Sequence, residues 1–123
     1  MNTQRYRDAL DAYRAHTGKD FEWKPAPGEP PAMQDMFEAM MESSYGASWS
    51  RPGLDTRTKC FISLTITAAL GTDELYKTHL RHAHHSGITK DEIAEFLIHL
   101  NAYAGAPRAA AAFFWTREVW QEA

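Results

Sequence analysis

The stretch that most constrains the fold runs from Arg51 to Gly87, RPGLDTRTKCFISLTITAALGTDELYKTHLRHAHHSG, because it holds the most apolar run and most of the ionisable groups. Asp55 follows a Pro-Gly turn, and its carboxylate can accept hydrogen bonds from the next backbone N–H groups. We therefore expect a helix to begin at Thr56 and to end at Gly71. Apolar groups on every side of this helix predict a central, buried position.

A strand is the alternative for the same segment. Ile62, Leu64 and Ile66 alternate with polar residues, and β-branched side chains at a period of two are typical of a half-buried strand. Residues 56–70 are more numerous than in a typical strand, however, and the neighbouring segments all have helical patterns. The context favours the helix, and the strand stays open as the local alternative.

A second helix is expected from Thr72 to Gly87, with Thr72 as its cap and Gly87 as a left-handed terminator. Its inward side is predicted to consist of four residues at helical spacing, namely Leu75, Tyr76, Leu80 and Ala83. His79 lies beside Tyr76 and Ala83 at the edge of that stripe. An imidazole is thus expected where the core would meet a cavity.

Four further helices complete the pattern and predict an all-α, single-domain bundle of about six helices. Residues 1–17 form the first, which Gly18 stops. Another runs from Pro31 to about Ser44, and its methionines are expected to be core, with an adaptable lining for a ligand or a partner helix as the alternative. Between them lies an irregular connector, whose Phe21 and Trp23 are expected to pack on their own or a neighbouring subunit, with the lining of a pocket mouth as the alternative.

The last two helices lie in the C-terminal third. Thr89 and Glu92 form a capping box, so a helix is expected from Lys90 to about Tyr103. Glu95, His99 and Tyr103 share one face of it; a structural Glu95–His99 pair or a satisfied core histidine is the alternative to a functional role. After Gly105, a final helix carries several aromatic residues, which suggests a subunit interface: Phe113, Phe114, Trp115 and Trp120.

Composition excludes several classes of protein. With 123 residues the chain has the length of one domain, and a net charge of −3 provides no basic footprint for nucleic acid or an anionic membrane. The single cysteine, Cys60, rules out an intrachain disulfide and fits a reducing compartment. No apolar run reaches the length of a membrane span, and the start MNTQRYRD does not resemble a signal peptide. We therefore expect a cytoplasmic location.

The histidine cluster at positions 79, 82, 84 and 85 raises the question of a metal site. Zinc sites on helices need a third ligand and a defined geometry, and neither HExxH nor CxxC occurs here. His84 and His85 also point away from the face of His79 on a helical wheel. No metal site is predicted.

Three motifs in order, WSRPGLDTRTK, AALGTDELYKTHLRHAHHSGITKDEI and LIHLNAYAGAP, resemble the carboxymuconolactone decarboxylase family. The resemblance covers residues 45–113 of a domain expected to span 1–123, and the Pro-rich segment 24–31 lies outside it. It implies an alkylhydroperoxidase D-like helical fold, a homo-oligomer (trimer or hexamer), and decarboxylation of a small carboxylated lactone or keto acid without a cofactor.

A sister branch, the alkylhydroperoxidase D proteins, works through a CxxC pair just upstream of a histidine. If His79 matches that histidine, Thr72 and Leu75 stand at the positions of the pair. Neither side chain can form a thiolate or a disulfide, and Cys60 alone cannot replace the pair. Thiol peroxidase chemistry is therefore not expected.

Loss of CO2 leaves a carbanion that must be delocalised as an enolate and then protonated. We expect His79 to be the general acid. Arg57 would bind a substrate carboxylate or the lactone carbonyl, with a surface ion pair to Asp55 or Glu74 as the alternative. Glu74 would orient a histidine, unless it only stabilises the first turn of its own helix.

The remaining predicted site residues lie in the outer two motifs. Trp49 and Arg51 are candidates for the pocket rim or for a contribution to a neighbouring subunit, and His99 and Tyr103 for hydrogen bonds to the substrate. No cofactor is expected, because the carbonyl of the substrate is itself the electron sink. Two other functions stay open: a lyase, cyclase or isomerase that works on a different substrate through an enolate, and a non-catalytic oligomeric binding protein.

Overall fold

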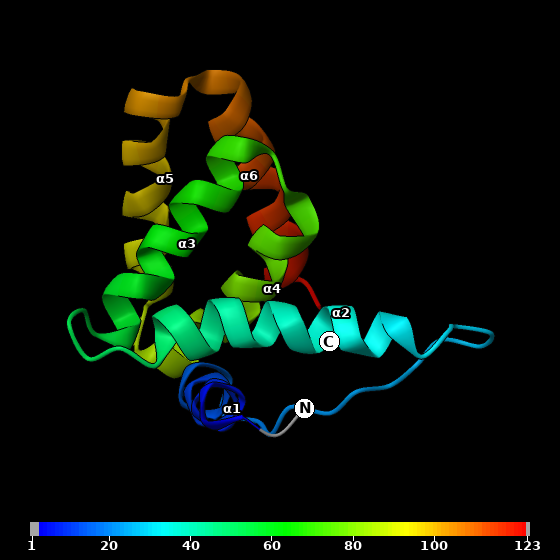
Figure 1. Cartoon of the computed structure of the whole chain (residues 1–123). Coiled ribbons are helices and arrows are strands. Elements are labelled where there is room, and N and C mark those ends of the chain that lie inside the picture. The colour runs from blue at the N-terminus through cyan, green and yellow to red at the C-terminus, as the bar shows by residue number, and fades with distance from the viewer. Residues whose placement is uncertain (1–2, 123) are drawn as a thin grey trace. The chain divides into compact units, whose positions relative to one another are not determined.

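The computed structural model describes residues 3–122 and confirms the all-α prediction over them. Its six α-helices are α1 (Gln4–Thr17), α2 (Ala32–Met41), α3 (Thr56–Leu70), α4 (Asp73–Ala83), α5 (Lys90–Ala104) and α6 (Ala106–Trp120) (Figure 1). A π-helix, η1 (Glu42–Trp49), continues α2, and a 3₁₀-helix, η2 (His84–Ser86), follows α4. The chain divides into two compact units, Met1–Thr56 and Arg57–Ala123. The prediction of one domain over residues 1–123 stays a prediction.

In the N-terminal unit, α1 begins after Thr3, whose hydroxyl oxygen accepts a hydrogen bond from the Tyr6 N–H at 3.0 Å. It ends at Gly18, the predicted stop, which has a left-handed φ of 75°. Met1 and Asn2, which the prediction included in this helix, lie outside the described residues. Gly46 of η1 lies against α1, because an added Cβ would collide with the backbone oxygen of Arg5.

The connector between α1 and α2 is irregular, as predicted, with neither helix nor strand over residues 18–31. Phe21 stacks on Phe37 of α2 with ring centroids 5.4 Å apart, and Trp23 lies 5.3 Å from the same ring. Tyr13 of α1 meets Phe21 edge-on at 5.7 Å. These aromatic contacts confirm that the connector packs on the protein.

The methionines of α2 are mostly exposed, so the prediction that they form core is wrong for three of them. Met33, Met36 and Met40 have 46%, 58% and 41% of their surface exposed, whereas Met41 is buried. On a helical wheel Met41 shares the packed side with Phe37, and the other three lie along the neighbouring face. The predicted end near Ser44 is also wrong, because η1 continues the helical rod to Trp49.

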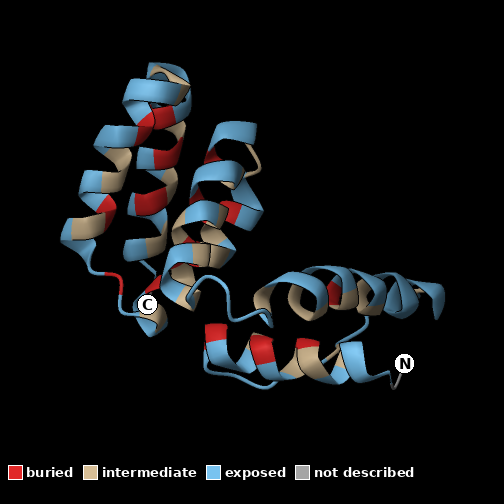
Figure 2. Ribbon diagram, turned by 60° about the vertical axis from the view of Figure 1, so that its left-hand side comes forward, coloured by how far each residue is buried: buried red, intermediate tan, exposed pale blue. Residues whose placement is uncertain are grey.

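The C-terminal unit is built from α3 to α6. Helices α5 and α6 run antiparallel and meet at a turn at Gly105 (Figure 1), and Figure 2 shows the buried positions gathered along one side of each helix. The capping box of Thr89 and Glu92 at the start of α5 is present as predicted. The core of this unit includes Leu64, Tyr76, Leu80, Ile93, Leu100, Ala109 and Ala112.

Helix α3 spans the predicted residues, so the strand alternative is wrong. The predicted central position is wrong as well, since only Cys60, Leu64 and Ala68 are buried. Ile62, Ile66 and Leu70 follow one another at every fourth position and have 43%, 52% and 68% of their surface exposed. The alternating apolar residues of this segment therefore lie on two faces of the helix: Leu64 is on the packed face, and Ile62 and Ile66 are on the exposed face.

Helix α4 keeps the predicted position but not every predicted detail. Thr72 stands at its N-cap, yet its hydroxyl donates to the Thr67 carbonyl at 3.0 Å and caps nothing. Leu75 is 53% exposed, so its predicted inward position is wrong, while Tyr76, Leu80 and Ala83 are buried as predicted. Gly87 ends the segment after η2 with a left-handed φ of 78°.

Candidate functional site

The candidate site is a groove between α3 and α5, which we call the α3–α5 groove. It consists of two hollows of about 530 Å³ and 350 Å³ that share Thr65, Phe96 and His99. The first is also lined by Phe61, Asp91, Glu92 and Glu95, and the second by Ala69, Leu100, Tyr103 and Ala104. A groove with aromatic walls and ionisable groups at one end suits a small ligand that is partly apolar and partly charged.

The residues that line the groove lie along one face of α3 and one face of α5, because they are three or four residues apart in sequence. Phe61, Thr65 and Ala69 are four residues apart on α3, and the α5 wall repeats at three or four residues through Glu92, Phe96, His99 and Tyr103. Phe61 and Phe96 face each other with ring centroids 6.4 Å apart. The same periodicity that buries one face of α5 therefore builds the groove along another.

Arg57 lies at the start of α3, beside the charged end of this groove. Its Nη2 donates to Oε2 of Glu92, which lies 35 residues further along the chain, and its guanidinium carbon is 5.4 Å from the Phe61 ring centroid. The predicted alternative for Arg57 was an ion pair with Asp55 or Glu74; the structure shows Glu92 as the partner. Both side chains of the pair are partly exposed, so the charge of Arg57 can be reached from solvent.

His99 and Tyr103, the two residues predicted to complete a pocket, do lie together on α5. Their ring centroids are 5.1 Å apart, and Tyr103 is 84% exposed. His99 is exposed, so it is not a core histidine, and among residues 3–122 no hydrogen bond or ion pair joins it to Glu95. The two alternatives to a functional role, a structural Glu95–His99 pair and a satisfied core histidine, are therefore wrong.

His79 lies on α4, and neither hollow of the α3–α5 groove is lined by that helix. It is half-buried on the flank that it shares with Leu75 and His82. Burial lowers the pKa of its imidazole, because desolvation disfavours the charged form. The structure thus gives His79 the shielded environment expected of a tuned histidine but does not bring it together with His99.

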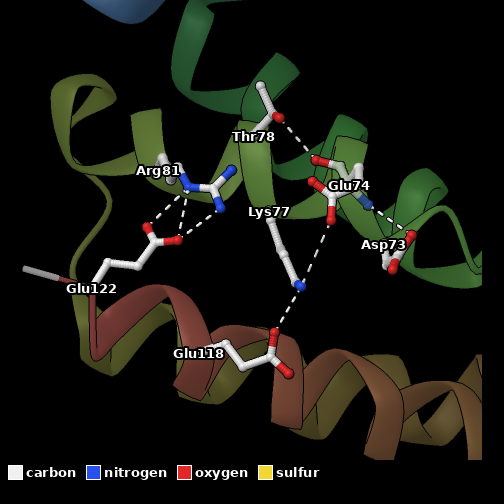
Figure 3. A network of polar contacts seen from close by, with 7 residues as sticks. All are labelled: Asp73, Glu74, Lys77, Thr78, Arg81, Glu118 and Glu122. Atoms are coloured by element: carbon white, nitrogen blue, oxygen red, sulfur yellow. Dashed lines mark hydrogen bonds and ion pairs between the residues drawn. The ribbon is translucent and has the colours of Figure 1, made fainter.

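Glu74 lies in a group of charged residues between α4 and α6. Its carboxylate is 78% exposed and lies 3.9 Å from the ammonium of Lys77, which also binds Glu118 of α6 at 2.7 Å (Figure 3). Arg81, one turn on, forms three hydrogen bonds with the carboxylate of Glu122, at 2.9, 3.3 and 2.7 Å. The structure places Glu74 in this α4–α6 ion-pair network and not against His79.

Trp49 and Arg51 belong to the N-terminal unit. Trp49 is the last residue of η1, and its ring stacks on the buried His16 with centroids 4.1 Å apart. It also lines a shallow hollow of about 450 Å³ with five other residues, Asp8, Asp11, Ala12, Ala15 and Ser50. Arg51 follows in the exposed loop before α3. Their predicted part in a pocket rim stays a prediction.

Several other chemistries find no support in residues 3–122. No group of three or more His, Cys, Asp and Glu side chains there could hold a metal ion. Burial raises the pKa of Cys60 to about 11, so its thiol stays protonated at neutral pH. Over the same residues, no helix has the length and apolarity to cross a bilayer.

Comparison with known proteins adds a family to this geometry. The family model described as "Carboxymuconolactone decarboxylase family" matches residues 34–118. The chain belongs to the carboxymuconolactone decarboxylase family. The resemblance noted in the sequence is thereby confirmed, and the matched region contains all seven predicted site residues of this family member: Trp49, Arg51, Arg57, Glu74, His79, His99 and Tyr103.

Three relatives of this family member carry names or descriptions. It is 35% identical over 89 residues to a 4-carboxymuconolactone decarboxylase of Acinetobacter baylyi, covering 72% of this chain and 66% of the relative. It is 30% identical over 82 residues to a nitrosuccinic acid decarboxylase of Metarhizium robertsii, covering 67% and 57%. An uncharacterized 15.0 kDa protein of Paracoccus denitrificans is 31% identical over 86 residues, covering 68% and 63%. The matches span less than two thirds of each relative.

Sequence reasoning missed two features of the groove. It identified Glu92 only as a capping residue, because its partner Arg57 is 35 residues away and no local spacing connects them. It also left out Phe61 and Phe96, which face each other across the groove. The sequence shows a phenylalanine on each of the two helices, but only the packing of α3 beside α5 shows that the two rings meet.

Proposed function

We propose that this chain is a decarboxylase that removes CO2 from a small, enolisable organic acid without a cofactor. Two relatives at 30–35% identity are named for decarboxylation of an acid. The observation that carries the proposal here is the contact of Arg57 with the α3–α5 groove: its guanidinium lies over Phe61 and pairs with Glu92, and both of these residues line the groove. The phenyl walls suit an apolar body, and Arg57 is proposed as the cation that binds the carboxylate of the substrate beside the lining carboxylates of Asp91, Glu92 and Glu95.

The chemistry sets the required parts. When the carboxylate leaves as CO2, its bonding electrons remain on carbon, and a neighbouring electron-withdrawing group must accept them. A lactone carbonyl and a nitro group, which the names of the two relatives imply, both serve in this way. The protein then has to hold the anion, stabilise the developing oxyanion and return one proton to carbon. Each of the last two contributions is worth about 10²–10⁴-fold in rate.

Arg57 is proposed to hold the anionic substrate, because its guanidinium lies over Phe61, which lines the groove. Phe61 and Phe96 would exclude water from the reacting carbon and so strengthen that attraction. His99 and Tyr103 would donate hydrogen bonds to the substrate from the far wall. Trp49 and Arg51 stay proposed as rim residues.

His79 is proposed as the proton donor. Burial lowers its pKa, so it is mostly neutral in the free protein at neutral pH. An anion bound next to this imidazole would raise that pKa and favour the protonated form needed for donation, which requires a substrate that extends from the α3–α5 groove to α4. His99 is the second candidate, because it lines the α3–α5 groove and His79 does not. Glu74 is not proposed to act on either histidine, since it pairs with Lys77.

The test is release of CO2 from γ-carboxymuconolactone and, separately, from nitrosuccinic acid by purified protein treated with a chelator. We expect Arg57→Lys to lose activity mainly through a higher KM, because Lys cannot reproduce the guanidinium geometry. Arg14→Lys is the matched control, since Arg14 forms an exposed ion pair with Asp20 at 3.3 Å in the N-terminal unit. Unchanged kinetics in Arg57→Lys would remove Arg57 from the proposal.

The two histidines are separated by the same assay. His79→Ala is expected to abolish turnover and His99→Ala to reduce it, with exposed His85→Ala as the control. The reverse order would make His99 the donor. A protein that binds these acids through Arg57 but releases no CO2 would be a binding protein or an enzyme with a different enolate reaction.

Assembly into a homo-oligomer, a trimer or hexamer, is part of the proposal. Phe113 and Phe114 of α6 have 45% and 57% of their surface exposed, and α5 and α6 together line an apolar groove of about 680 Å³. Large exposed apolar surface of this kind commonly marks an interface. Light scattering should give an oligomer for the wild type and a smaller species for Phe114→Glu; a wild-type monomer would refute assembly.

A further inference from the structure

The carboxylate of Glu92 has two separate bonding roles in the C-terminal unit. Its Oε1 accepts from the backbone N–H of Thr89 at 3.0 Å and from the Thr89 hydroxyl at 3.3 Å, which closes the capping box of α5. Its Oε2 binds Nη2 of Arg57 on α3. One side chain therefore binds both the start of α5 and the arginine that lies over Phe61 of the groove.

Arg57 has spare binding capacity while it is held. Only Nη2 of its guanidinium is used by Glu92, and over residues 3–122 its other N–H groups form no hydrogen bond. The guanidinium also lies over the Phe61 ring, 5.4 Å from its centroid, so two contacts from different directions limit its rotamers. A substrate carboxylate can bind the unused N–H groups without displacing Glu92.

The geometry points to Glu92 as the positioning residue for Arg57: it holds the guanidinium over Phe61 of the groove, ready to receive the carboxylate of the substrate. This inference rests on the proposed role of Arg57 in substrate binding. Two opposing effects follow from the charge of Glu92. It restricts the motion of Arg57, which favours catalysis, and it weakens the attraction of Arg57 for any anion, because a carboxylate already neutralises part of the charge.

Glu92→Gln separates the two roles of this side chain. Glutamine also completes a capping box, so its Oε1 can keep the hydrogen bond from Thr89. Its amide NH2 then faces Arg57, and two donors cannot bind each other. The variant keeps the helix cap and loses the hold on Arg57. Thr89→Ala is the matched control, because it removes the hydroxyl of the cap and leaves the Glu92–Arg57 pair intact.

Two readouts test the inference, and the first needs no turnover. In Glu92→Gln, the NMR signal of the Arg57 Nε–H group should shift and exchange faster with solvent, and succinate, used as an inert anion probe, should bind about three- to tenfold more tightly. Thr89→Ala should show neither change. An Arg57 signal and a succinate affinity like those of the wild type in Glu92→Gln would overturn the inference, whatever the enzyme does with a substrate.

The second readout is the division between kcat and KM for an acid that the wild type decarboxylates. Glu92→Gln should lower kcat about tenfold while KM stays the same or falls, because the anion still binds but in a looser position. Thr89→Ala should keep both constants. Equal losses in the two variants would show that Glu92 acts only as a helix cap. If the wild type decarboxylates no acid, the proposed function fails, and the NMR and succinate measurements still decide the role of Glu92.

Discussion

The buried hydroxyl pair of Tyr76 and Thr116 gives a quantitative prediction about the packing of α4 on α6. The two oxygens are 2.6 Å apart, and both residues are almost fully buried. Thr116 also donates its hydroxyl hydrogen to the Ala112 carbonyl at 2.7 Å. Because Thr116 has one hydrogen to give, the Tyr76 hydroxyl must be the donor of the bond between them.

This direction predicts an asymmetry between the two deletions. Tyr76→Phe removes the donor and leaves an acceptor lone pair unused, which should lower the free energy of unfolding by about 1 kcal/mol. Thr116→Val leaves the phenol as a buried donor without an acceptor and should cost about 2 kcal/mol. The double variant should cost less than the sum, because no polar group is then left unsatisfied.

Urea unfolding followed by circular dichroism, at one protein concentration for all four proteins, measures these values. The difference between the single variants corresponds to a few degrees in Tm for a unit of this size. Burial raises the pKa of Tyr76 to about 12, and the bond to Thr116 moderates that rise, so the pKa of Tyr76 should be higher still in Thr116→Val. A Tyr76→Phe variant less stable than Thr116→Val, or fully additive costs, would refute the assigned direction.

Three further predictions concern titration and surface charge. Burial lowers the pKa of His79 below its ordinary value of 6.5. Its contribution to stability is therefore complete above about pH 6.5 and is lost as pH falls through the folded-state pKa. The free energy of unfolding of the wild type should fall relative to that of His79→Gln over this pH range, and a constant difference between the two proteins would contradict this. Cys60, with a pKa of about 11, should react with iodoacetamide at neutral pH only after denaturation, and rapid labelling of the native protein would show that its thiol is accessible. Glu122→Gln removes the exposed pair with Arg81 and should change the urea midpoint slightly at low salt and not at high salt, whereas a large, salt-independent loss would indicate a buried role.

Local features of the fold were predictable because the signals lie within a few residues of one another. The Thr89–Glu92 capping box, the left-handed stops at Gly18 and Gly87 and the length of α3 all follow from such signals. Which face of each helix is buried was harder to predict than the position of the helix. The exposed Ile66 and Met36 have the composition of core residues, and only the arrangement of the neighbouring helices decides which apolar face is covered.

The same limit applies to the candidate site. His99 and Tyr103 were predicted to lie together because they are one turn apart, and they do. Glu74 was assigned a histidine that it does not contact, because a first-turn carboxylate can reach several partners and Lys77 is the one in reach. The pairing of Arg57 with Glu92 depends on the packing of two helices far apart in sequence, which no single segment encodes.

The most direct test of the proposed decarboxylation is to run the reaction in heavy water and follow it by NMR. An acid that releases CO2 through a carbanion should give one molecule of CO2 per molecule of product, with a single deuterium on the carbon that carried the carboxylate. We expect this result with the wild type and its loss in His79→Ala. Consumption of the acid without release of CO2, or a product without deuterium at that carbon, would contradict the account and indicate a different reaction on the same fold.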